Sequence, residues 1–245
     1  MNSAPSSLIE AQTYFRQIAS EIAQNYAVRK PKNSDQVTPP QLIEALEQFL
    51  TVSIKLDQEE GPTGPILQED VTELGGYGLS LIVDLAAWAG QLDLKKERAD
   101  IEGLSILVAD WIIRHEGKLY VLEPIVNSLA LSANKLSEPR ALEKMAEYMT
   151  RVLEASADTV KQDLEKANPG RPWRVLHLNR GIVATRSHNT ALMQKIFDDL
   201  ARNLPEDAPQ FFEEGMQQMD ALNYPAHVKQ VMNQYFTTWA NHTLH

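Results

Sequence analysis

The stretch LQEDVTELGGYGLSLIVDLAAWAGQ, residues 67–91, decides the fold class of this chain. Its second half is apolar at nearly every position, and so is LSILVADWII at residues 104–113. Helices that are hydrophobic on all sides are typical of the centre of a helical protein. We therefore expect two central helices, over residues 67–91 and 97–115.

The N-terminal segment shows the spacing of a one-sided helix. Five apolar residues recur there at steps of three and four: Leu8, Ala11, Phe15, Ile18 and Ile22. This pattern predicts an amphipathic helix that starts at Ser6 or Ser7 and ends before Pro31. The polar segment KPKNSDQVTPP, residues 30–40, contains three prolines and is typical of a linker.

Capping and breaking signals place the remaining helices. Thr38 followed by Pro39 and Gln41 forms a capping box that opens a helix. We expect further helices over residues 119–136 and 139–167, and near 188–203, 206–222 and 225–241. The window VLHLNRGIVAT, residues 175–185, allows a hairpin or a short helix, and its place between helices favours the helix.

These elements predict an all-α fold of eight or nine helices in antiparallel pairs. The pairs would form an irregular bundle or a solenoid-like array of TPR or HEAT type, although no repeat of 34–47 residues is established. Residues 1–30 are expected to be an N-terminal amphipathic helix with a linker to about residue 40. Residues 38–245 would then form a single all-helical domain.

Composition excludes several classes of function. The chain has 245 residues with 33 acidic and 23 basic side chains, a net charge of −10 that argues against binding nucleic acid or anionic membranes. The absence of cysteine excludes disulfides, thiol nucleophiles and thiolate metal sites. Neither a signal peptide nor an apolar stretch of about 20 residues is visible. We therefore expect a cytoplasmic protein.

One segment reverses the acidic balance. Residues 171–202 contain six basic and two acidic side chains, and they also contain His177 and His188. Arginine binds phosphates and carboxylates through paired hydrogen bonds, which makes this segment a candidate docking point for an anion or an acidic partner. The candidate binding residues are Arg171, Arg174, His177, Arg180, Arg186 and His188.

The alternative interpretation is that these arginines pair with the surplus carboxylates of the protein itself, a common arrangement. If this segment is helical, Trp173, Leu176 and Arg180 share one face of the helix. Arg180 would then be partly buried and paired, either as part of the core or in a pocket.

Two further patterns have a structural and a functional interpretation. The glycine cluster LGGYG, residues 74–78, could hold a phosphate, but it lacks a P-loop ending and a preceding strand, so close helix packing is the favoured explanation. Asp84 and Asp110 lie in apolar helices and would form an acid–base or metal site if they faced each other. Arg114 follows Asp110 at the spacing of a simple surface pair, which we favour.

No catalytic or metal motif is recognisable, and we predict no metal, no cofactor and no catalytic residues. The six histidines lack the i,i+4 spacing of a helical metal site, and neither HExxH nor GxSxG occurs. The leading hypothesis is a protein–protein interaction or scaffold module that uses a helical groove and the basic residues of 171–186 to bind an unidentified protein. The alternative is a small-ligand-binding protein or enzyme whose anionic substrate is held by the same arginines.

Overall fold

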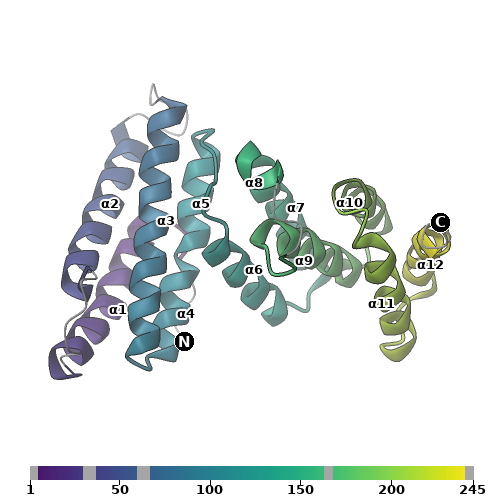
Figure 1. The fold of residues 1–245 in the computed structure, drawn as a ribbon, viewed down its shortest axis with the longest axis horizontal. Helices are drawn as coiled ribbons and strands as arrows, with labels where there is room; N and C mark the ends of the chain where they lie inside the picture. The colour runs from purple at the N-terminus through teal and green to yellow at the C-terminus, as the bar shows by residue number, and fades with distance from the viewer. Residues whose placement is uncertain (1–4, 30–36, 60–66, 163–167, 241–245) are drawn as a thin grey trace. The chain divides into compact units, whose positions relative to one another are not determined.

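The computed structural model describes residues 5–29, 37–59, 67–162 and 168–240, and every regular element in these ranges is an α-helix (Figure 1). The predicted all-α class is confirmed, and adjacent helices pack in pairs. The helices are α1 (Leu8–Arg29), α2 (Pro39–Glu59), α3 (Gln68–Gln91), α4 (Lys95–Gly103), α5 (Ser105–Arg114), α6 (Glu123–Lys135), α7 (Pro139–Ala155), α8 (Asp158–Gln162), α9 (Pro172–Ser187), α10 (Thr190–Asn203), α11 (Ala208–Ala221) and α12 (Ala226–Ala240).

The chain divides into two compact units. Unit 1 comprises Met1–Ser128 and Ala155–Asp163, and unit 2 comprises Leu129–Glu154 and Leu164–His245. The backbone therefore passes from one unit to the other three times: within α6, at the end of α7 and between residues 163 and 164. The predicted boundary near residue 38 lies inside unit 1, between α1 and α2.

The first two helices of unit 1 begin at side-chain caps. The Ser6 amide donates to the Glu10 carboxylate at 2.7 Å, and the Glu10 amide donates to Ser7 Oγ at 3.3 Å, directly before α1 begins. At α2, the Thr38 amide donates to Gln41 Oε1 at 3.0 Å. These bonds satisfy amides that have no partner within the helix, so the capping box fixes where α2 begins.

The predicted apolar stripe of α1 is buried at all five of its positions. Through this stripe α1 packs against α2, α4 and α5. The N-terminal helix is thus part of unit 1, and burial of its apolar face stabilises its attachment.

The centre of unit 1 is the contact of α3 with α2 and α5. Trp111 on α5 is completely buried and meets the Phe49 ring of α2 edge-on, with ring centroids 6.2 Å apart. A Cβ at Gly75 would lie 2.3 Å from Ile112, and one at Gly78 would lie 2.5 Å from the Phe49 ring. These glycines allow the close helix packing that the sequence favoured.

Two predicted helices are interrupted by contacts with distant residues. The helix expected over residues 97–115 is divided into α4 and α5 at Leu104, where Ser128 Oγ donates to the Glu102 carbonyl at 2.8 Å and occupies it. The helix expected over 139–167 is divided at Ser156, which forms an isolated parallel bridge with Leu119.

The helix expected from residue 119 instead begins at Glu123. Pro124 has no amide proton and is compatible with the first turn of a helix, so this position is a natural start for α6. Residues 118–122 before it are not helical, and Leu119 pairs with Ser156 in the parallel bridge. This difference creates a surface that the sequence did not indicate.

In unit 2 the ambiguous window at residues 175–185 is helical, as predicted, and forms most of α9. Helix α10 packs against α9 and α12, and α11 packs against α12. An aromatic cluster joins these helices, with the Phe197 ring 5.2 Å from the rings of both Phe212 and Tyr235. The aromatic residues of the last two helices therefore contribute to the core of unit 2.

Candidate functional site

Arg180 is the most deeply buried residue of the predicted basic segment, with 2% of its surface exposed. Its guanidinium pairs with the Asp199 carboxylate of α10 and donates to Thr150 Oγ1 at 3.3 Å. The pairing agrees with the expectation for Arg180, and its burial is more complete than the partial burial that was expected. The Nε atom is also buried and has no hydrogen-bond partner in the part of the chain that the structure describes.

His177 lies one helical turn before Arg180 and is equally buried. Its ring meets Trp173 edge-on at 4.4 Å, and its Nδ1 lies 3.3 Å from a nitrogen of the Arg180 guanidinium. Burial, reinforced by the charge of Arg180 and only partly opposed by Asp199, lowers the pKa of His177 to about 3. The imidazole is therefore neutral at neutral pH.

Arg174 and Arg186 contact other acceptors within unit 2. Arg174 forms a two-pronged pair with Asp207, at 2.9 and 2.5 Å, and donates to the Pro169 carbonyl at 2.6 Å. Arg186 donates to two carbonyls at the end of α6, those of Ala133 at 3.0 Å and Leu136 at 2.5 Å. The latter bonds satisfy carbonyls that a helix end leaves without partners.

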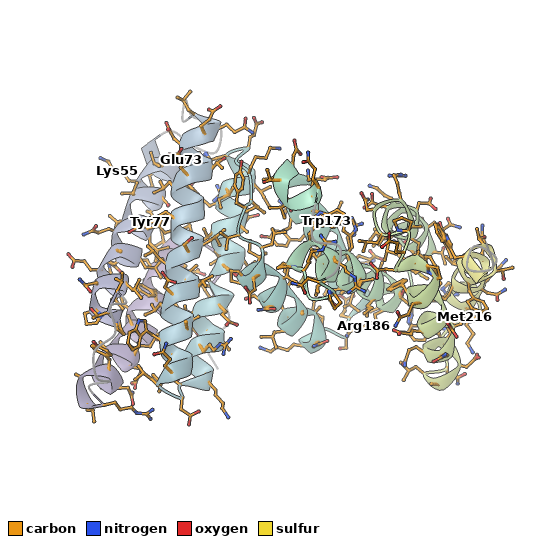
Figure 2. The ribbon with its side chains drawn as sticks, viewed as in Figure 1. Lys55, Glu73, Tyr77, Trp173, Arg186 and Met216 are labelled. Atoms are coloured by element: carbon orange, nitrogen blue, oxygen red, sulfur yellow. The ribbon has the colours of Figure 1, made fainter. Side chains whose placement is uncertain are left out.

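The two remaining candidates lie at opposite ends of α9. The Arg171 guanidinium is 5.9 Å from the centre of the Trp173 ring, a cation–π distance. His188 is exposed, has a left-handed backbone with φ of 60°, and meets the Tyr224 ring at 5.4 Å. Figure 2 shows Trp173 and Arg186 well separated along unit 2.

The structure thus brings His177 and Arg180 together around Asp199, whereas the other candidates have separate neighbours. Seven of the nine guanidinium nitrogens of Arg174, Arg180 and Arg186 donate to acceptors of the same unit. The binding of an anion or partner by the six predicted residues stays a prediction.

A different surface in unit 1 has polar groups without partners. It is a hollow of about 620 Å³ between α3 and the segment that precedes α6. We call it the α3 groove. It is lined by Gln68, Glu69, Thr72, Glu73, Gly76 and Ser80 of α3 and by residues 118, 120 and 121.

Hydrogen bonds connect the first turns of α3 to residues 116–118, and the α3 groove begins where these bonds end. Gln68 Nε2 donates to the Glu116 carbonyl at 2.5 Å, and one turn later Thr72 Oγ1 accepts the Lys118 amide at 2.9 Å. The next turn of α3 contains Gly76, which has no side chain. A Cβ at Gly76 would meet nothing within 4 Å, so there is open space where a third contact of this series would lie.

The backbone at Tyr120 faces this space. The Leu119 amide donates to the Ala155 carbonyl, and the Leu119 carbonyl accepts the Ala157 amide, both at 2.9 Å. In an extended chain the polar groups of successive residues point to opposite edges, so those of Tyr120 point away from residues 155–157 and toward the α3 groove. Within the described ranges, the Tyr120 amide and carbonyl have no hydrogen-bond partner.

The groove is bordered by negative charge and exposed tyrosine. Helix α3 contains four carboxylates and no Lys or Arg, and in the part of the chain described here neither Glu69 nor Glu73 has an ion-pair partner. Tyr120 is 56% exposed. Figure 2 shows Glu73 and Tyr77 on α3, and Lys118 is the one basic residue in the groove lining.

Asp84 and Asp110 have the simpler of the two explanations that the sequence allowed. Asp110 pairs with Arg114 at 3.2 Å, as the spacing predicted, and Asp84 lies on the exposed side of α3. Arg114 and His115 also bind Asp57, at 3.1 and 2.8 Å. Among the described residues, no group of three or more His, Asp or Glu side chains is arranged to hold a metal ion.

No helix in the described ranges is both long enough and apolar enough to cross a membrane. No known family model matches this chain, and no characterised protein or solved structure resembles it significantly.

The sequence did not reveal the role of Thr72 or Tyr120 because residue 119 was assigned to a helix. The sequence signal that could have moved the helix start was Glu123-Pro124, since proline favours the first turn of a helix. The partner of Leu119, Ser156, lies 37 positions later and left no local signal.

Proposed function

We propose that this chain is a protein-interaction module that receives a partner protein in the α3 groove of unit 1. The observations that carry this proposal are the Tyr120 backbone without a partner among the described residues and the open space at Gly76, which line the same hollow. Backbone groups at an unpaired edge are a template for another chain, and many interaction domains bind partners by adding a strand to such an edge.

The proposal retains the interaction module that the sequence favoured and gives it a different surface. In unit 2 the donors of Arg174 and Arg180 are engaged by Asp207 and Asp199. An external anion would have to replace these carboxylates, and leaving a buried charge without its partner costs several kcal/mol. The alternative of an anionic substrate held by the same arginines is therefore less well supported.

The proposal is tested by filling the groove with a side chain. Gly76→Leu places a helix-favouring residue where a Cβ meets nothing within 4 Å. Gly103→Leu is the matched control, because Gly103 is also a helical glycine whose Cβ would meet nothing within 4 Å and it does not line the groove. Both variants should unfold at or above the wild-type temperature.

Partners are then captured from a native lysate of the source organism and quantified for the wild type and both variants. We expect a partner that is held by the wild type and Gly103→Leu and lost by Gly76→Leu. Equal capture by all three proteins would overturn the proposal. A partner kept by Gly76→Leu but lost when Arg171 and His188 are changed to Ala would instead favour the predicted basic segment.

A further inference from the structure

This inference rests on the proposed function and names the chemistry of the partner. We infer that the occupant of the α3 groove is an extended peptide segment that carries Lys or Arg and forms backbone hydrogen bonds with Tyr120. Three observations support this identity: the unpaired edge, the missing side chain at Gly76 and the charge of α3.

The edge selects an extended occupant. Tyr120 offers one amide and one carbonyl on the same side of the chain, and an extended peptide presents a matching carbonyl and amide at every second residue. The interior of a helix has none to offer, because its amides and carbonyls are already bonded to each other. A partner helix could fill the hollow but would leave the Tyr120 groups without partners.

The length and floor of the groove fit such a segment. From Gln68 to Ser80, the helical rise of α3 gives about 18 Å, which accommodates about five extended residues. At Gly76 the backbone of α3 is uncovered, so a second backbone can approach it closely. A side chain at this position would occupy the space that the peptide needs.

The charges select a basic occupant. Glu69 and Glu73 lie one turn apart on the α3 side of the groove and have no ion-pair partner among the described residues. The exposed ring of Tyr120 adds an aromatic face, to which Lys and Arg are attracted. An acidic segment would be repelled by Glu69 and Glu73, and Lys118 alone would not offset these two charges.

The test begins with a phage-displayed library of random linear dodecapeptides. The library is selected on the full-length wild-type protein after depletion on Gly76→Leu, with Gly103→Leu as a second positive target. We expect enriched peptides with a net positive charge that bind the wild type and Gly103→Leu. Enrichment of acidic or strongly helix-forming peptides would overturn the inference.

Methylation of the peptide backbone then tests the extended conformation. Each amide nitrogen of the best synthetic peptide is methylated in turn, and its affinity is measured by fluorescence anisotropy. Loss of the hydrogen bond to the Tyr120 carbonyl, with the added methyl group in the way, should weaken binding about tenfold at one central position and little at the positions on either side of it. A period of three to four residues, or no effect at any position, would contradict an extended occupant.

The charge requirement has its own matched pair of variants. Changing Glu69 and Glu73 together to Gln should weaken binding about fivefold at low salt, as expected for two exposed charge contacts. Glu21→Gln with Asp93→Asn changes the net charge equally outside the groove lining and should have little effect. Equal losses in the two double variants would overturn a specific role for Glu69 and Glu73.

These results separate the two proposals. If no peptide is selected but a lysate partner is still lost in Gly76→Leu, the partner docks as a folded surface, and the inference fails while the proposed function stands. If Gly76→Leu loses neither a peptide nor a partner, both fail.

Discussion

Two regions of this molecule are rich in polar groups, and they differ in where the partners of those groups come from. In unit 2, the guanidinium of Arg174 binds Asp207, and that of Arg180 binds Asp199. In the α3 groove of unit 1, the backbone of Tyr120 has no partner within the described ranges. The arginines of the first region are the most conspicuous charges in the sequence, yet many of their hydrogen-bond donors are used inside the unit. The second region has free bonding capacity that the residue types alone do not reveal.

Among the variants that test this comparison, Asp199→Ala should cause the largest loss of stability. The change leaves the buried guanidinium of Arg180 without its carboxylate. Because the Asp199 side chain is one-third exposed and water can reach it, we expect a loss near the lower end for buried pairs, about 3 kcal/mol in the free energy of unfolding. Urea unfolding at pH 7.5 measures this loss.

Asp220→Ala is the control for that experiment. Asp220 pairs with Lys229 at 3.4 Å in the same unit, but its side chain is 77% exposed. We expect its free energy of unfolding to change by no more than about 0.5 kcal/mol. A similar small change in Asp199→Ala would mean that the Arg180 pair is not a structural part of unit 2.

The next effect concerns pH. His177 stays neutral in the folded chain because its pKa is lowered to about 3, whereas in the unfolded chain it titrates near 6.5. Below pH 6.5 the unfolded state binds the additional proton, so stability falls by up to about 1.4 kcal/mol per pH unit. At pH 5 the loss from this residue should be about 2 kcal/mol.

His177→Phe, which keeps an aromatic ring beside Trp173, should remove this pH dependence. Unfolding free energies at pH 7.5 and pH 5 are compared for the wild type, His177→Phe and the control His188→Asn. The exposed His188 should leave the difference unchanged, and asparagine tolerates its left-handed backbone. A wild-type slope retained in His177→Phe would contradict the buried neutral imidazole.

A smaller effect distinguishes neighbouring glycines of α3. In Gly75→Ala the new methyl group would overlap Ile112, and we expect a loss of about 1.5 kcal/mol from overpacking. In Gly76→Ala the methyl group enters the open groove, so better helix propensity should raise stability by about 0.5–1 kcal/mol. Thermal unfolding of the two variants provides the comparison, and a loss of stability in Gly76→Ala would show that the groove is not open.

Local patterns in the sequence predicted the features that depend on neighbouring residues. The apolar stripe of α1, the Thr38–Gln41 cap and the close packing at Gly75 follow from spacing and residue type, and all agree with the structure. The same reasoning predicted that Arg180 is partly buried and paired. It could not name Asp199 as the partner, because that choice depends on how α10 packs against α9.

The α3 groove depends on distant contacts and was missed for that reason. Leu119 and Leu122 fit the apolar spacing of the following helix, so periodicity extended that helix too far toward the N-terminus. The pairing of Leu119 with Ser156 holds the segment in an extended form, and the lack of a side chain at Gly76 leaves its outer edge open. The extended form of this segment and its open edge both depend on contacts between residues far apart in the sequence, so local patterns do not predict them.

The central claim is that the backbone edge at Tyr120 is unoccupied in the free protein, and amide hydrogen exchange followed by NMR tests it most directly. The amides of Leu119 and Ala157 are hydrogen-bonded and should exchange slowly. The Tyr120 amide should exchange close to the rate of an unstructured peptide and become protected only when a peptide binds. Protection of Tyr120 equal to that of Leu119 in the free protein would contradict the account.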